Sequence, residues 1–414
     1  MAKPFRSRFH RAFLAVVAAL GIGSSGLVLD NLPKNPQTDT QKISTIETST
    51  GLHGINISPS DQFWKHTLGS KTEAQKADEL LTAAGNGDSW RAQALFEHGV
   101  KAKSEAAVEA LSIASLRGDN DVVNVLLKNG VDPTANDGQA LVSAVRGYNT
   151  GLAIRYLELG VPGGSQDNQA LIYATVEGNS YLVQELINHG AAVDARQGEP
   201  LVFATMMGNQ FMMETLLANG ADAKAADNLA LRAASEAGNV SLMQRLISAG
   251  ADVGGANGEA LRLAVGSGNT EAVKLVLQQR SPSVDINAGN GEALQLAVLF
   301  GDGDMVRTLI DNGANVNANE GITLSLAVYE GKTDVVQMLI DRGADVNADK
   351  GSALYTAVYL GKTDMAQLLM QNKANPDLRD GKIKQAATDP AMQQILQGTT
   401  TAPQNNLPGP GPLF

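Results

Sequence analysis

The stretch that decides the fold is GKTDVVQMLIDRGADVNADKGSALYTAVYLGKTD, residues 331–364, which begins and ends on the same four letters thirty residues apart. Inside it, Leu354 is followed by Ala357 three positions later and by Gly361 seven positions later. The same spacing recurs in both directions along the chain. A fixed period of this size predicts stacked structural units in place of one globular core.

The leucine position is filled nine times, and each leucine is followed three residues later by alanine. The leucines are Leu111, Leu141, Leu171, Leu201, Leu231, Leu261, Leu294, Leu324 and Leu354. Residues three apart share a face of a helix, so the leucine fills an interface and the small alanine lets a neighbouring helix approach. Each unit is therefore predicted to begin with a helix, called here the inner helix.

Glycines predict where the helices end. A glycine stands seven residues after the leucine in every unit except at Tyr148, and in most units a second glycine follows twelve residues later. Glycine ends helices at little cost because it accepts left-handed backbone angles. Each unit should thus consist of the inner helix, a turn, an outer helix and a polar extended loop such as Ala344–Ala348. The predicted fold class is all-α, a solenoid of stacked helix-turn-helix repeats with short connecting loops.

Residues 331–348, GKTDVVQMLIDRGADVNA, resemble the motif of the ankyrin repeat family, above all in the tail GADVNA. The resemblance covers roughly residues 72–397. The start of the inner helix departs from the family's usual Thr-Pro-Leu-His, with Ser352-Ala353-Leu354-Tyr355 here, and the period is 30 residues instead of 33. The resemblance implies an ankyrin-type α-solenoid that recognises proteins through a concave groove and its loops.

The array is expected to span residues 71–398 in about eleven units, including irregular units around Leu80 and Ile383 at its two ends. Terminal units of a stack are atypical because one face meets water. The period slips once, since Gly268 and Gly301 are 33 residues apart, with the extra length around Ser281-Pro282-Ser283. A longer loop accounts for the slip, and a hinge between two sub-arrays is the alternative.

The N-terminal segment predicts export. The first eleven residues carry four basic residues and no acidic one, and Ala12–Leu29 carries no charge, an order typical of an export signal. Ser24 and Gly26 are small enough for a cleavage site, but these 18 residues also reach the lower limit for a membrane span. Residues 1–29 are therefore a signal peptide or an N-terminal membrane anchor. The array is expected to be periplasmic or secreted, or held on the non-cytoplasmic side by residues 12–29.

The segments flanking the array are predicted to lack regular structure. Residues 30–70 are polar without sustained periodicity, which favours a flexible linker, although Phe63 and Trp64 are candidates for docking on the first unit. Residues 399–414 contain four prolines, which favours a disordered Pro-rich tail over a proline-recognition ligand.

Charge and composition exclude several classes of partner. The net charge of −11 should repel nucleic acid and anionic lipid, so membrane contact is expected only through the N-terminal segment. The chain has no cysteine, which excludes disulfides and thiolate metal sites. Stability must then come from stacking.

Motifs for catalysis or cofactor binding are weak. Gly331-Lys332-Thr333 and Gly361-Lys362-Thr363 imitate the end of a phosphate-binding loop, but Leu326 and Thr356 stand where that loop needs glycine. These triplets occupy the turn between helices, so we expect the threonine to cap the outer helix. The five histidines are scattered, and no nucleophile elbow occurs. The sequence predicts no enzyme, no cofactor and no metal.

A partner-binding surface is predicted at the end of the inner helix. In an ankyrin-like unit, the residues five and six positions after the leucine point into the concave groove. Several units place apolar or aromatic residues there, namely Met206, Met207, Leu299, Phe300, Tyr329, Tyr359 and Leu360. Exposed apolar residues in a row mark interaction sites. The alternative is that these side chains pack on the neighbouring inner helix.

Two functions remain open from the sequence. The first is an exported scaffold that mediates protein–protein interaction, without catalysis, through its groove and loops. The second is a membrane-anchored structural spacer or assembly element of the cell envelope. The sequence does not identify the partner, because the binding surfaces of repeat proteins vary independently of their framework.

Overall fold

The computed structural model describes residues 61–279, 284–300 and 303–398. The predicted export segment 1–29 and tail 399–414 lie outside these ranges. Every regular element within them is a helix, which confirms the all-α class. In the same ranges, no helix combines the length and the apolar character needed to cross a bilayer.

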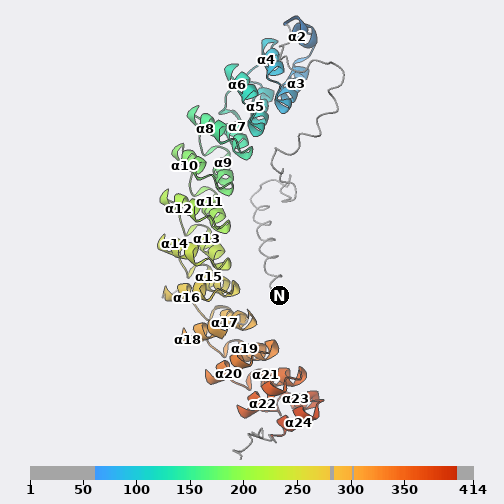
Figure 1. Cartoon of the computed structure of the whole chain (residues 1–414), viewed down its shortest axis with the longest axis vertical. Coiled ribbons are helices and arrows are strands. Elements are labelled where there is room, and N and C mark those ends of the chain that lie inside the picture. Colours follow the sequence, from blue (N-terminus) through green and yellow to red (C-terminus); the bar gives the residue numbers. More distant parts are fainter. Residues whose placement is uncertain (1–60, 280–283, 301–302, 399–414) are drawn as a thin grey trace, which may run out of the picture. The chain divides into compact units, whose positions relative to one another are not determined.

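The helices follow one another as pairs, with an inner and an outer helix in each unit (Figure 1). The inner helices are α3 (Glu73–Asn86), α5 (Glu105–Arg117), α7 (Ala135–Arg146), α9 (Ser165–Val176), α11 (Ala195–Met206), α13 (Ala225–Glu236), α15 (Gly255–Gly266), α17 (Ala288–Phe300), α19 (Ala318–Glu330) and α21 (Ala348–Tyr359). The outer helices are α4 (Ser89–Glu97), α6 (Asn120–Lys128), α8 (Thr150–Glu158), α10 (Ser180–Asn188), α12 (Gln210–Ala218), α14 (Val240–Ser248), α16 (Thr270–Gln278), α18 (Gly303–Asp311), α20 (Thr333–Asp341) and α22 (Thr363–Gln371). The terminal elements are α2 (Asp61–Leu68), η2 (Arg379–Gly381), α23 (Lys382–Ala386) and α24 (Pro390–Leu396).

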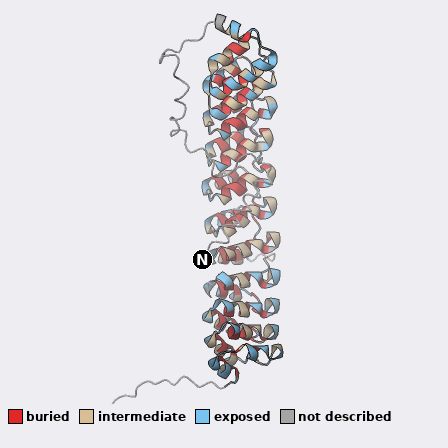
Figure 2. Cartoon of the chain, turned by 90° about the vertical axis from the view of Figure 1, so that its right-hand side faces the viewer, coloured by how far each residue is buried: buried red, intermediate tan, exposed pale blue. Residues whose placement is uncertain are grey.

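Each inner helix packs against the inner helices of the units before and after it, and most neighbouring outer helices also pack against each other, so the array has two layers. All nine leucines of the repeat are at most 2% exposed, and all nine alanines that follow them are 0% exposed. Buried residues recur in every helix pair along the stack (Figure 2). The predicted leucine and alanine positions therefore form the interface between units.

The loops between units are tighter than the extended loops predicted from the sequence. From α7 onward the inner helix opens with consecutive residues in the left-handed region, for example Asn136, Asp137 and Gly138 with φ of 50°, 50° and 66°. The last residue of this turn is glycine or asparagine in every unit from α7 onward. These residues are Gly138, Asn168, Gly198, Asn228, Gly258, Gly291, Gly321, Gly351 and Gly381. Glycine and asparagine tolerate this backbone conformation best, so the turn explains a position that the repeat pattern alone left unassigned.

A side-chain hydrogen bond, called here the clamp, ties the loop of one unit to the unit before it. The amide N–H of Asp345 donates to Oδ1 of Asn317 at 2.8 Å, and Nδ2 of Asn317 donates to the carbonyl oxygen of Gly343 at 2.9 Å. Asn287 and Asn347 make the same pair of bonds to the units that follow them. The clamp satisfies a loop N–H that the helices leave unpaired.

The lysines of the Gly-Lys-Thr triplets cap the inner helix of the preceding unit. Nζ of Lys332 donates to the carbonyl oxygen of Val298 at 2.9 Å, and Nζ of Lys362 donates to those of Val328 and Tyr329 at 2.9 and 2.8 Å. A cation at a helix C-terminus is favoured by the helix dipole. The expectation of a threonine cap is wrong, because Lys332 occupies the N-cap of α20 and makes no side-chain cap bond.

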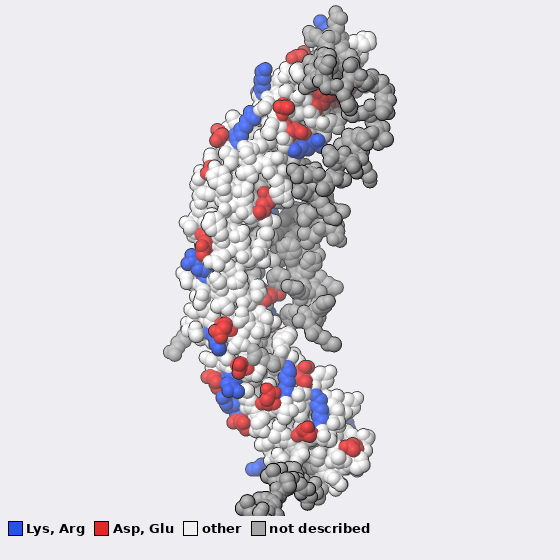
Figure 3. All heavy atoms as spheres, in the orientation of Figure 1, with Lys and Arg blue, Asp and Glu red and all other residues white. Residues whose placement is uncertain are grey.

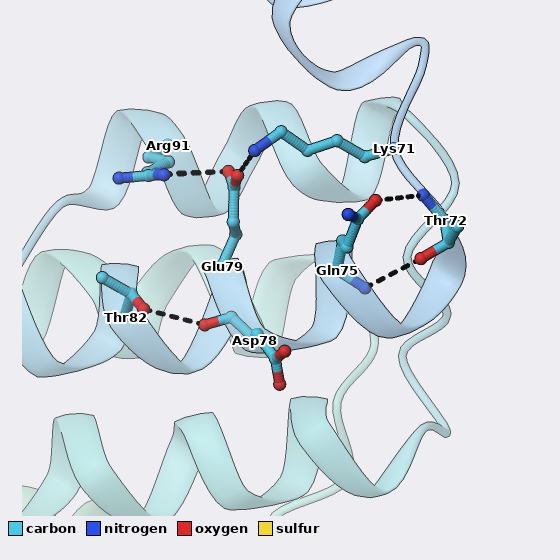
Figure 4. Close-up of polar contacts among 7 residues, drawn as sticks. All are labelled: Lys71, Thr72, Gln75, Asp78, Glu79, Thr82 and Arg91. Atoms are coloured by element: carbon cyan, nitrogen blue, oxygen red, sulfur yellow. Dashed lines mark hydrogen bonds and ion pairs between the residues drawn. The ribbon is translucent and has the colours of Figure 1, made fainter.

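The N-terminal end of the array starts earlier than predicted. Residues 61–68, assigned from the sequence to the flexible linker, form α2, whose Leu68 is 0% exposed and whose Trp64 packs against the core. The linker prediction is wrong for this stretch because Trp64 and Leu68, four residues apart, share one helix face. In the first unit, Thr72 and Gln75 form a capping box, and the carboxylate of Glu79 pairs with Arg91 at 2.9 Å (Figure 4).

We expect Leu261→Ala to lower the free energy of unfolding by about 2–5 kcal/mol, because it removes a buried side chain and leaves a cavity between α15 and its neighbours. Urea titration followed by circular dichroism measures the change. The matched control is Leu299→Ala, whose leucine is 39% exposed and whose effect should stay within about 0.5 kcal/mol. An unchanged stability in Leu261→Ala would show that the repeat register is wrong.

Candidate interaction surface

The predicted partner-binding residues lie at the C-terminal ends of the inner helices, and the structure exposes six of the seven. The exposed fractions are 54% for Met207, 39% for Leu299, 47% for Phe300, 60% for Tyr329, 71% for Tyr359 and 39% for Leu360. Met206 differs, since it is half-buried and packs against the core, as the packing alternative expects, and its part in partner binding stays a prediction.

Five of these residues belong to three consecutive units and form what we call the C-terminal apolar surface: Leu299, Phe300, Tyr329, Tyr359 and Leu360. They are brought together because α17 packs on α19 and α19 packs on α21. Side chains at the same position of neighbouring inner helices therefore become neighbours in space.

The aromatic side chains at the end of α21 are held in place by their surroundings. The ring of Tyr359 stacks on the ring of Tyr355, with 6.0 Å between centroids. The guanidinium of Arg379 lies 5.3 Å from the centroid of the Tyr355 ring, and Asp349 accepts a hydrogen bond from Arg379 at 2.9 Å. Stacking and cation–π contact fix ring orientation. The Tyr359 ring is thus exposed to solvent, while its stacking on Tyr355 fixes its orientation.

Met207 lies apart from the C-terminal apolar surface. The units of α13 and α15 intervene, and at the corresponding positions they carry Glu236, Ala237, Gly266 and Ser267. The inner helices of these two units are also joined by an ion pair, with Glu259 of α15 accepting from Arg232 of α13 at 2.6 Å, and Glu259 also pairs with Arg262 of its own helix at 2.5 Å. The predicted residues therefore form one compact group and one separate methionine.

The structure also exposes aromatic residues that the sequence prediction missed. Tyr181 and Phe211 are 61% and 67% exposed in the first turns of α10 and α12, and Trp90 is 47% exposed at the same position in α4. This position lies ten residues after the leucine, where later units carry Asp304, Asp334 and Asp364. An aromatic residue at a position that other units fill with an acidic or small residue was the available signal.

Two carboxylates at the ends of inner helices ionise less readily than usual. Burial raises the pKa of Glu177, the C-cap residue of α9, to about 7. Burial also raises the pKa of Glu236, with a smaller upward effect from Glu259, while Arg262 and Arg232 act in the opposite direction. Desolvation disfavours the charged form of a carboxyl group.

The described residues carry no arrangement for metal chemistry: no group of three or more His, Cys, Asp or Glu side chains among them is placed to hold a metal ion. On the face drawn in Figure 3, basic and acidic side chains of the described part are interspersed. A field of one sign, as nucleic-acid binding requires, is not formed on that face.

We expect Glu177→Gln to stabilise the protein at about pH 8 and to have no effect at about pH 4. Between the ordinary carboxyl pKa of 4.5 and the folded value of about 7, the unfolded chain releases this proton while the folded chain retains it. Stability therefore falls as pH rises through this window, and the amide variant escapes the loss. Urea midpoints at the two pH values measure it. The same difference in urea midpoint between the variant and the unmodified protein at both pH values would contradict a pKa of Glu177 raised by burial.

Comparison with known proteins finds a family whose repeats match those of this chain. The family model described as ankyrin repeats (3 copies) matches residues 141–227, 231–320 and 319–380, which together make up more than half of the chain. No curated protein matches the chain. The stacked inner and outer helices and the family match agree, and the chain belongs to the ankyrin repeat family.

Proposed function

We propose that the chain is a non-catalytic scaffold that binds a protein partner through the C-terminal apolar surface. Ankyrin repeats generally mediate protein–protein interaction. The observation that carries the proposal is the exposure of Tyr329 and Tyr359, 60% and 71%, at adjacent inner-helix ends. These two side chains are more exposed than any other large apolar side chain of the described inner helices.

The chemistry of this surface suits a protein partner. Tyrosine provides a large apolar contact and a hydroxyl group at low conformational cost, and it is enriched among the residues that dominate binding energy. Support of the Tyr359 ring by Tyr355 reduces the entropy lost on binding. Leu299 and Leu360 extend the contact area on both sides.

We also propose that the scaffold acts after export, as a periplasmic or secreted protein or on the non-cytoplasmic side of a membrane. The basic start and uncharged segment Ala12–Leu29 support this proposal. The partner is then a protein of that compartment.

A photocrosslinking residue at Tyr329 or Tyr359, introduced into the protein in its native compartment, should give a discrete adduct with the partner. The same residue at Tyr181 is the matched control, because Tyr181 is equally exposed but lies on an outer helix. Adducts from all three positions, or from none, would contradict a defined site. Absence from all three would favour the spacer function.

The combined variant Leu299→Ser, Phe300→Ser, Tyr329→Ser and Tyr359→Ser should weaken capture of the crosslinked partner by more than about tenfold. The melting temperature should stay nearly unchanged, because surface substitutions alter stability by about 0.5 kcal/mol or less. The control variant Tyr148→Ser, Tyr181→Ser and Phe211→Ser should retain capture. A large drop in melting temperature would show that the four residues belong to the core.

A further inference from the structure

We propose that the boundary between the unit of α15 and α16 and the unit of α17 and α18 is a joint in the array. The units before it and the units after it form two blocks whose mutual orientation varies more than that of any other neighbours from α9 onward. This inference does not depend on the proposed function. It stands on the clamp, on the packing of the left-handed turns and on a cavity.

From α9 to the C-terminal end, the clamp is present at six boundaries between units. Its N–H to oxygen distances are 2.7 Å for Ala192 to Asn168, 2.8 Å for Asp222 to Asp194, 2.7 Å for Asp252 to Asn228, 2.7 Å for Asn315 to Asn287, 2.8 Å for Asp345 to Asn317 and 2.7 Å for Asn375 to Asn347. The acceptor thus comes from one of two positions, seven or three residues before the leucine.

One boundary in this range lacks the clamp, the one between α15 and α17, and both acceptor positions there are glycine. They are Gly254 and Gly258, seven and three residues before Leu261. Neither has a side chain, so neither supplies the side-chain acceptor that the clamp needs. This is also the boundary at which the sequence period lengthens to 33 residues.

The left-handed turn at Gly258 also lies further from the next unit than the turns at Gly198 and Gly291 do. A β-carbon added to Gly198 or Gly291 would lie 2.5 or 2.7 Å from the β-carbon of the alanine that opens the next unit. At Gly258 the nearest atoms belong to the backbone of Asp285, at 3.9 Å. A cavity of about 240 Å³ lies there, lined by Gly258, Arg262, Ile286 and Glu292 among others.

The contacts that remain at this boundary oppose separation of the two units more than rotation of one unit against the other. Leu261 and Leu294 are buried, so the apolar contact persists. Apolar contact is non-directional, whereas a hydrogen bond constrains direction. The ion pair from Arg262 to Glu292 spans the boundary at 3.8 Å, and Glu292 is half-exposed. Such pairs contribute little. The joint therefore separates Met207 from the C-terminal apolar surface.

Distances between spin labels measure the joint directly, because the chain contains no cysteine of its own. The pair Ser241→Cys and Asp334→Cys spans three boundaries, including the joint. The control pair Tyr181→Cys and Glu271→Cys spans three boundaries that all carry the clamp. All four labelled residues are exposed and stand ten residues after their leucines.

Pulsed electron–electron double resonance on the full chain should give a broader distance distribution for the pair across the joint than for the control pair. Adding Gly258→Asn, which copies Asn168 and Asn228 at the same turn position, should narrow it to the control width and leave the control pair unchanged. Gly254→Asn, which copies Asn287, is the second variant if the first does not fold. Equal widths in the unmodified array, or a broad distribution that neither folded variant narrows, would overturn the proposal.

Discussion

The structure depends on the burial of one leucine side chain per unit between neighbouring inner helices. Full burial of such a side chain stabilises by about 1.5–3 kcal/mol, but a single helix pair cannot bury it without a neighbour. The alanine three residues later allows that neighbour to come close, and every alanine at this position is fully buried. The stack is therefore held together one boundary at a time.

Close approach of the inner helices leaves backbone N–H and carbonyl groups that other parts of the repeat must pair. The chain must turn sharply to enter each inner helix, and the left-handed turns that end in glycine or asparagine do this. Loop N–H groups and helix-terminal carbonyls are then satisfied by the next unit or the one before, through clamp residues such as Asn317 and caps such as Lys332. These bonds are directional, so they set how one unit is oriented on another. Where Gly254 and Gly258 leave the clamp without an acceptor, the apolar contact and one weak ion pair set that orientation.

The sequence predicted the parts of the fold that repeat and missed those that depend on local geometry. Leucine, alanine and glycine spacing identified helix pairs and the buried positions, because each follows from helix periodicity. The left-handed turn was missed, because asparagine and aspartate at Asn136 and Asp137 are equally compatible with an extended polar loop. The helix at Asp61–Leu68 was missed because eight residues carry too little periodic signal. For the surface, exposure of Tyr329 and Tyr359 followed from their register, whereas Met206 is half-buried because the packing at the end of each inner helix varies with its neighbours.

Hydrogen exchange followed residue by residue in the folded protein tests this account most directly, since it reports which backbone segments each unit protects. The account predicts slow exchange in the inner helices around every buried leucine from Leu111 to Leu354, recurring with the period of the repeat, and fast exchange in the turns between them. A single protected stretch, with the inner helices of the remaining units exchanging as fast as their turns, would contradict a structure held together by burial at every boundary.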